Sequence, residues 1–387
     1  MTSPKRIGIL TGGGDSPGLN AVIRAVAKSL ILDAGAEVIG IADGFAGMVE
    51  RRVRPLGLHD VSGILALGGT VLGTSNKANP FAWHDRGGAD VSAEAIRYAR
   101  EELKLDAVVA IGGDGSMSIA HRLHLGGLPM VGVPKTIDND LVHTDRTFGF
   151  DTAVAIATEA MDRLRTTAES HHRVMILETM GRHAGWIALY AGVAGGADVI
   201  LVPEIDYDVD EVARVCRARE QGGQRHTLIC IAEGAKPRGG EQAVRQLVAD
   251  SHDPVRLGGI AHVLERALAQ RLDSEVRTAI LGHVQRGGPP TAYDRTLATA
   301  FGAYAAALVA ARRYGRMVAV QEGRLTSVAL ADVADRQRTV PQDAPMQTLG
   351  AQLRVLPGLQ VPLPSQLRAP CSVAPLQLPG THWVPAT

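Results

Sequence analysis

Residues 5–31 read KRIGILTGGGDSPGLNAVIRAVAKSLI: a short apolar run, a glycine-rich stretch, and then apolar residues at helical spacing. The run at 5–10 predicts a buried β-strand, and the spacing over 20–31 predicts a helix. The glycines between them, at 11–18, are typical of the tight strand-to-helix turns of parallel α/β proteins.

The same alternation of strand and helix continues along most of the chain. Because it favours right-handed βαβ units, we expect two successive α/β blocks with parallel sheets. Further strands are expected at 37–43, 106–113, 128–134, 173–179, 197–204 and 226–234. Further helices are expected at 92–104, 116–124, 151–166, 184–194, 208–220, 258–271 and 294–313.

Composition limits the class of protein. The chain has 387 residues, 45% of them hydrophobic and 21% charged, which predicts a soluble globular protein of two domains or one large one. Lys plus Arg equals Asp plus Glu at 40 each, so no overall charge favours nucleic acid or a membrane surface. No stretch reaches the roughly 18 apolar residues of a membrane helix. Three cysteines without a CxxC pair fit a reducing, cytoplasmic compartment.

The C-terminal part differs from the rest. Residues 341–387 hold 9 of the chain's 20 prolines, and hydrophobic periodicity fades there. We interpret most of this segment as an irregular tail. The alternative is an arm that becomes ordered on a neighbouring subunit.

Two glycine-rich strand ends are candidates for phosphate binding. In TGGGDSPG, residues 11–18, glycines let backbone N–H groups approach an anion at a helix N-terminus. In IGGDGS, residues 111–116, Asp114 is a candidate Mg²⁺ contact, and Gly115 leaves room beside it. The alternatives are an ordinary tight turn for the first stretch and a turn with an Asx-type cap for the second.

A third strand end, VGVPKTIDND at residues 131–140, carries the candidate catalytic groups. Residues two apart in an extended segment face the same way, so Asp138 and Asp140 can converge on one spot. One carboxylate can accept the proton of an attacking hydroxyl, and Lys135 can neutralise phosphate charge. A solvated polar turn is the alternative, although ligands of α/β proteins bind outside the carboxyl ends of strands.

Cationic side chains accompany the strands of the second block. Guanidinium groups bind phosphate bidentately, so several arginines near strand ends favour a phosphate-ester pocket. These cations are Arg173, Arg182, Arg277, His283 and Arg286. Glu233 could bond sugar hydroxyls or cap a helix. Together with the two aspartates, these residues predict a kinase for a phosphosugar or a similar metabolite.

Five motifs follow one another along the chain: GGGDSPGLN, GGDGS, PKTIDND, MGRHAGW and LGHVQRGG. In this order they resemble the 6-phosphofructokinase family, from about Lys5 to about residue 340. The resemblance implies two facing Rossmann-like α/β domains with mainly parallel sheets. It also implies a homo-oligomer, expected to be a tetramer with a dimer as the alternative. The implied reaction is phosphorylation of the 1-hydroxyl of fructose 6-phosphate.

The resemblance also implies a division of the chain. A domain that binds nucleotide and Mg²⁺ comprises residues 1–149 and about 287–340. A domain that binds fructose 6-phosphate comprises 150–286, and the proline-rich tail comprises 341–387.

Roles follow for residues that match the family's motifs. Asp138 is the expected proton acceptor, and Asp114 the expected contact for the implied cofactor, Mg²⁺. Arg173 and Arg277 are expected to reach the sugar's 6-phosphate across a subunit interface. The other expected catalytic residues are Asp140, Arg182 and Thr136. The substrate-binding set is Thr136, Ile137, Asp138, Arg173, Met180, Gly181, Arg182, Glu233, Arg277, His283, Val284, Gln285 and Arg286. The nucleotide-binding set is Gly14, Asn76, Lys77, Gly113, Asp114, Gly115 and Ser116.

The identity of the phosphate donor depends on two positions. Pyrophosphate-dependent members of the family tend to have Asp after GGD and Lys before TIDND, whereas many ATP-dependent members have Gly at both. This chain combines Gly115 with Lys135, which resembles the mixed-substrate branch. Gly115 leaves space for the α-phosphate of ATP, whereas an extra cation excludes neither donor. ATP is therefore the expected donor, and pyrophosphate in a reversible reaction is the alternative.

One position of the nucleotide-binding set departs from the family's pattern. Asn76 stands where an arginine is common, so Lys77 or Lys135 is expected to replace that cation.

A non-catalytic, regulatory member of the family is an alternative function of another class. Such a protein would be expected to lose Asp138 or Arg182, and both are present.

Overall fold

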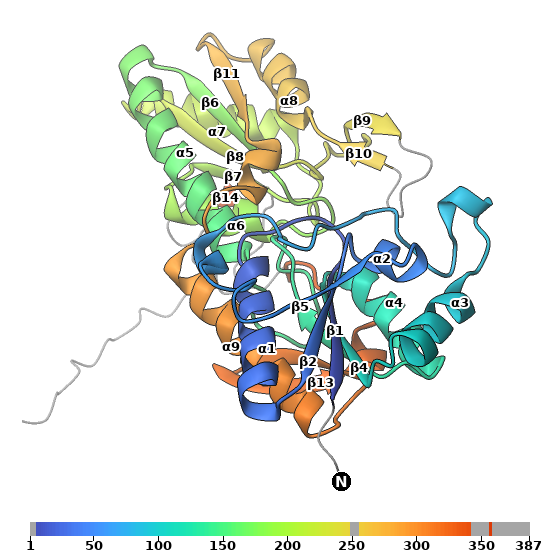
Figure 1. The fold of residues 1–387 in the computed structure, drawn as a ribbon. Helices are drawn as coiled ribbons and strands as arrows, with labels where there is room; N and C mark the ends of the chain where they lie inside the picture. The colour runs from blue at the N-terminus through green and yellow to red at the C-terminus, as the bar shows by residue number, and fades with distance from the viewer. Residues whose placement is uncertain (1–4, 248–254, 342–355, 358–387) are drawn as a thin grey trace, which may run out of the picture.

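The computed structural model describes residues 5–247, 255–341 and 356–357. It contains two α/β lobes, each built on one mainly parallel sheet (Figure 1). The fold class expected from the sequence is therefore confirmed. Within the described ranges, no helix combines the length and apolar character needed to cross a membrane.

The first lobe is built on a seven-stranded sheet in the order β13-β12-β5-β4-β1-β2-β3. Its five inner strands run parallel, and the edge strands β3 and β13 are antiparallel to their neighbours. The strands are β1 (Arg6–Thr11), β2 (Glu37–Ile41), β3 (Val53–Pro55), β4 (Ala107–Gly112), β5 (Met130–Pro134), β12 (Arg316–Gln321) and β13 (Arg324–Ala329).

Helices cover both faces of this sheet and bury one apolar cluster on each. α1 (Leu19–Ala34) and α9 (Ala292–Ala310) pack on one face. The other face is covered by α2 (Phe45–Val49), α3 (Ser92–Arg97), α4 (Asp114–Leu125) and α10 (Leu330–Val333). A π-helical turn, Tyr98–Glu102, continues α3.

The second lobe is built on a five-stranded parallel sheet in the order β11-β6-β8-β7-β14. Its strands are β6 (Val174–Thr179), β7 (Val199–Leu201), β8 (Thr227–Ala232), β11 (Val276–Ile280) and β14 (Leu356–Pro357). α5 (Phe150–His171) and α6 (Trp186–Ala194) cover one face; α7 (Val209–Gln221) and α8 (Ile260–Ala269) cover the other. A hairpin, β9 (Val244–Leu247) and β10 (Val255–Leu257), precedes α8. Most of the expected tail, 341–387, lies outside the described residues.

One helix boundary changes the geometry of a candidate site. The sequence predicted a helix from residue 116, but α4 begins at Asp114, because the Met117 N–H already donates to the Gly113 carbonyl at 3.0 Å. Asp114, Gly115 and Ser116 therefore form the first helical turn, where a helix has free backbone N–H groups.

A buried polar cluster joins the two lobes where α5 and α9 begin. The Asp294 carboxylate accepts the backbone N–H and the hydroxyl of Thr152, at 2.8 and 2.6 Å. Thr291 donates its own N–H to the Thr152 hydroxyl at 3.0 Å. Asp294 is fully buried, and burial raises the pKa of its carboxyl. The cluster thus aligns the first turn of α5 with α9.

Asp294→Ala should destabilise the protein, because it leaves the buried Thr152 N–H and hydroxyl without acceptors. We expect the free energy of unfolding to fall by about 2–4 kcal/mol. Urea denaturation measures this loss. Asp162→Ala, at an exposed aspartate of α5, is the control and should change stability by less than about 0.5 kcal/mol. Equal effects of the two substitutions would show that the cluster does not stabilise the junction.

Candidate active site

The loops that follow β1, β4 and β5 meet at one edge of the first sheet. They hold the three glycine- or aspartate-rich stretches singled out in the sequence. Lys135 links two of them, because it follows β5 and its Nζ donates to the Gly14 carbonyl at 2.5 Å. Its side chain is only 4% exposed. Burial, assisted by the charge of Arg286, lowers the pKa of Lys135 to about 8.

Asp138 and Asp140 lie in the loop after β5. The Asp138 N–H donates to the Thr136 hydroxyl at 3.0 Å, and Asn139 between the aspartates has a left-handed backbone with φ +52°. Burial raises the pKa of Asp138, although Arg286 and Lys135 oppose this effect. Burial and the charge of Asp138 raise the pKa of Asp140 to about 7. One Asp138 oxygen, Oδ1, is buried without a hydrogen-bond partner, so this carboxylate has free capacity to accept a proton or a ligand hydrogen bond.

Asp114 opens α4 beside this loop, with Gly113 before it and Gly115 and Ser116 after it. Its Oδ2 accepts from the Gln337 amide at 2.7 Å. The segment with Asn76 and Lys77, both exposed, lies against the β1 loop, since Gly13 N–H donates to the Ser75 carbonyl at 3.2 Å. All the nucleotide-site residues predicted from the sequence therefore lie on these adjoining loops or in the first turn of α4.

Arg286, from the second lobe, reaches the first. Its Nη1 donates to the Asp15 carbonyl at 3.0 Å. A Cβ placed on Gly14 would come within 2.9 Å of the same nitrogen. Glycine at this position thus permits the close approach of the guanidinium, which links the loop after β1 to the loop after β11.

The other predicted residues of the second lobe lie on segments that are hydrogen-bonded to one another, here called the interlocked unit. The Met180 N–H donates to Gln285 Oε1 at 2.7 Å, and Gly181, with φ +130°, accepts from Gly234 N–H at 3.1 Å. Glu233 stands beside Gly234, and burial raises the pKa of its carboxyl to about 7. Arg182 follows in the same loop and is half-buried.

Several predicted site residues have surroundings that the sequence did not indicate. The Ile137 side chain is fully buried in the second lobe's core, so it anchors the loop and only its backbone can face a ligand. Gln285 is also fully buried and supports Met180. His283 and Val284 are exposed, and Val284 borders a surface hollow beside α5.

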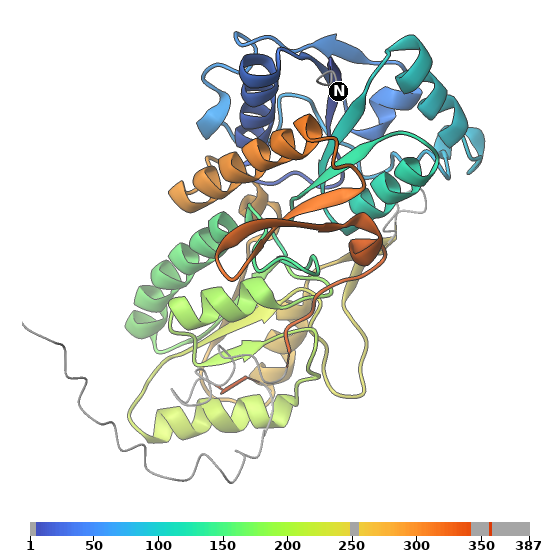
Figure 2. The same ribbon diagram turned by 90° about the horizontal axis from the view of Figure 1, so that it is seen from below.

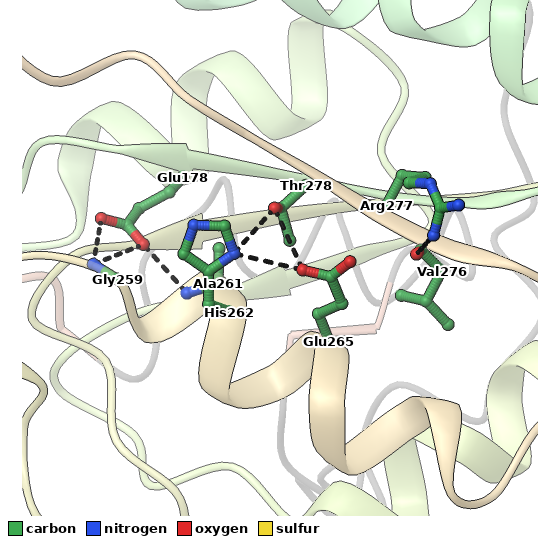
Figure 3. Close-up of polar contacts among 8 residues, drawn as sticks. All are labelled: Glu178, Gly259, Ala261, His262, Glu265, Val276, Arg277 and Thr278. Carbon is green, nitrogen blue, oxygen red and sulfur yellow. Dashed lines mark hydrogen bonds and ion pairs between the residues drawn. The ribbon is translucent and has the colours of Figure 1, made fainter.

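Arg173 and Arg277 are not brought to this chain's own site. They lie near the amino ends of β6 and β11, and both pair with Glu275. The site loops follow the opposite ends of these strands. Figure 3 shows Arg277 on the other side of the drawn group from Glu178, whose carboxylate accepts the N–H groups of Gly259 and Ala261 at 2.9–3.1 Å.

Sequence reasoning missed three residues around the site. Glu178 holds the start of α8 against β6. Gln337 contacts Asp114, and Arg338 contacts the loop that carries the aspartates. Glu178 stands two residues before the MGRHAGW motif. Gln337 and Arg338 had no local signal, because their partners are about 200 residues away in the sequence.

The pKa of Asp140 predicts a pH-dependent stability. An unfolded Asp has a pKa of about 4, so the folded chain binds more protons between about pH 4 and 7 and loses stability as pH rises through that window. Asp140→Asn removes this loss and should raise the free energy of unfolding at pH 8, by up to about 4 kcal/mol. Below pH 4 the difference should vanish. Urea denaturation at both pH values tests this, with Asp162→Asn as the control; a less stable Asp140→Asn variant at pH 8 would contradict it.

Comparisons with known proteins agree with this geometry. A phosphofructokinase family model matches residues 6–309. An "ATP-dependent 6-phosphofructokinase 2" of Clostridium perfringens is 49% identical over 88% of this chain and 94% of that protein. A pyrophosphate–fructose 6-phosphate 1-phosphotransferase of Amycolatopsis methanolica is 50% identical over 87% of this chain and 97% of that protein.

Solved structures give the same answer. A phosphofructokinase from Saccharomyces cerevisiae aligns with a TM-score of 0.72 and 30% identity. The alignment covers 85% of this chain but 45% of the yeast chain. The chain therefore belongs to the phosphofructokinase family, as its five ordered motifs predicted.

Proposed function

We propose that this protein is an ATP-dependent 6-phosphofructokinase, which transfers the γ-phosphate of ATP to the 1-hydroxyl of fructose 6-phosphate. The products are fructose 1,6-bisphosphate and ADP. The observation that carries the proposal is the buried, unpartnered oxygen of Asp138, in a loop framed by Lys135, Asp114 and Arg286. Such a carboxylate suits proton acceptance from a hydroxyl nucleophile.

Each lobe has its own task in this mechanism. The loops after β1 and β4 hold the donor's phosphates, with backbone N–H groups of the first turn of α4 and the charge of Lys135. The interlocked unit around Met180 and Glu233 holds the sugar. Arg286 lies between them and, with Arg182, stabilises negative charge on the transferring phosphoryl group. Asp138 takes the proton of the 1-hydroxyl as the new O–P bond forms, while the bond between the γ-phosphorus and the β–γ bridging oxygen breaks and ADP leaves.

Mg²⁺ is the proposed cofactor. Asp114 keeps one carboxylate oxygen beyond the one that accepts from Gln337. Within the described ranges, no three His, Cys, Asp or Glu side chains cluster around a common point that could hold an ion. A single carboxylate, that of Asp114, suits Mg²⁺, which takes one or two carboxylates and completes its shell with phosphate oxygens and water. When bound, the ion supplies positive charge that screens the donor's phosphates.

The proposal includes a homo-oligomer, expected to be a tetramer, in the cytoplasm. Arg173 and Arg277 support the oligomer, because they lie together at the strand ends remote from this chain's own site. We propose that they bind the 6-phosphate in the site of a neighbouring subunit. Two buried free thiols, Cys216 and Cys230, are consistent with a reducing compartment.

Pyrophosphate remains the second candidate donor, and Lys135 favours it. The buried ammonium donates to the Gly14 carbonyl in the loop after β1. At this position it would bind a compact diphosphate that lacks a nucleoside. One relative at 50% identity carries a pyrophosphate-dependent name.

Initial rates with fructose 6-phosphate and Mg²⁺ should distinguish the donors. We expect activity with ATP and little with pyrophosphate at equal concentration. Gly115→Asp should lower kcat/KM for ATP by at least about tenfold, because its carboxylate would repel and crowd the α-phosphate. Lys135→Gly should leave ATP as the donor. Activity with pyrophosphate alone would replace the main proposal with the second one.

Asp138→Ser should reduce kcat by about 10²–10⁴-fold while KM for fructose 6-phosphate changes little, because the proton acceptor is lost and binding contacts remain. Steady-state kinetics at saturating donor measure both parameters, with Asp162→Ser as the control. Near wild-type turnover would mean that Asp138 is not the base.

A further inference from the structure

Residues 334–341, here named the strap, pass from the first lobe to the second. α10, just before the strap, packs against α4. Val340, near its end, is 2% exposed in the core of the second lobe, and its N–H donates to Glu204 at 2.8 Å. Figure 2 shows this red-orange segment leaving α10 and running to the second sheet. Both ends of the strap are therefore fixed, one on each lobe.

Arg338 lies at the middle of the strap and faces the catalytic loop, residues 136–147. Its guanidinium donates to the carbonyl oxygens of Asn139 at 2.8 and 3.2 Å, Thr144 at 3.0 Å, and Asp145 at 3.2 and 3.3 Å. Its backbone N–H donates to the Asp140 carbonyl at 2.6 Å. These contacts use every nitrogen of the planar fork, a geometry that arginine provides and lysine does not.

Trp186 completes the surroundings of this side chain. The guanidinium carbon lies 4.9 Å from the centre of an indole ring, and Trp186 Nε1 donates to the Arg338 carbonyl at 3.2 Å. Since Trp186 is the first residue of α6, Arg338 is held by the second lobe while it holds the loop.

The carbonyls that Arg338 binds belong to a segment without regular structure. Residues 136–147 contain no helix or strand, so their carbonyl groups need other donors. Asn139 also has a left-handed backbone, which is uncommon for residues other than glycine. Its peptide group stands between Asp138 and Asp140. A donor that fixes the Asn139 carbonyl therefore restricts the orientation of both carboxylates.

We propose that Arg338 is a positioning residue for phosphoryl transfer. It clamps the catalytic loop to the second lobe and thereby holds Asp138 against the hydroxyl of the bound sugar. A direct role in phosphate binding is disfavoured, because the guanidinium nitrogens already face carbonyl oxygens. Gln337, the preceding residue, extends the same strap to Asp114. The proposal rests on the function proposed above.

The kinetic test compares Arg338→Ala and Arg338→Lys with Arg336→Ala, an exposed arginine of the same strap. We expect Arg338→Ala to lower kcat by about 10²-fold, because a small displacement of the base is costly, with KM for fructose 6-phosphate within about threefold of wild type. Arg338→Lys should lose at least about tenfold, since an ammonium cannot span three carbonyls. Millimolar methylguanidinium should restore part of the lost kcat in Arg338→Ala. Arg336→Ala should match wild type.

A second measurement does not depend on turnover. Hydrogen exchange should be faster in peptides covering 136–147 of Arg338→Ala, but not of Arg336→Ala. Unchanged exchange, or an unchanged kcat in an active enzyme, would overturn the positioning role. A wild-type protein that phosphorylates no fructose 6-phosphate with either donor would refute the proposed function instead, and the exchange experiment would still decide whether the clamp exists.

Discussion

The site depends on charges that are kept out of water. Lys135 is 4% and Asp140 8% exposed, and isolated ions at such depth would be strongly destabilising. Here opposite charges compensate one another only in part, so the pKa values of the lysine and the carboxylate approach each other, at about 8 and about 7. A bound phosphate ester would add negative charge beside Lys135 and Arg286, in addition to that of the nearby aspartates. Phosphate binding is thus favoured by the same cations that the fold keeps out of water.

Parallel topology makes this concentration of charge feasible. Strands β1, β4 and β5 all end at one edge, so three loops distant in the sequence meet without a long connection. The second lobe supplies the opposing side, and two of the contacts between lobes fall on the site itself. Ile137 belongs to the catalytic loop but packs in the second core, and Arg286 follows β11 but binds the loop after β1. A change in the relative position of the lobes would therefore also change the geometry of the catalytic residues.

Much of this arrangement could be predicted from the sequence. Alternating strands and helices predict the fold class, and glycine- or aspartate-rich strand ends indicate the site, because both signals are local. The direction in which each side chain points was harder to predict from the sequence. Ile137 and Gln285 were predicted to bind substrate from their positions in the motifs. Both side chains are instead fully buried, and that of Gln285 accepts the Met180 N–H. Arg338 was out of reach, because one arginine in a polar stretch gives no sign that carbonyl groups 199 positions earlier face it.

The short strand β14 has a consequence for the molecule's outer boundary. Leu356–Pro357 pairs with β7 at the end of the second sheet, where β7 would otherwise present a row of open backbone groups. Such rows are templates for edge-to-edge aggregation. A two-residue strand that ends in proline satisfies part of the edge and offers almost no hydrogen-bond donors of its own, since proline has no amide hydrogen. Leu356–Pro357 thus limits further strand pairing at this end of the second sheet.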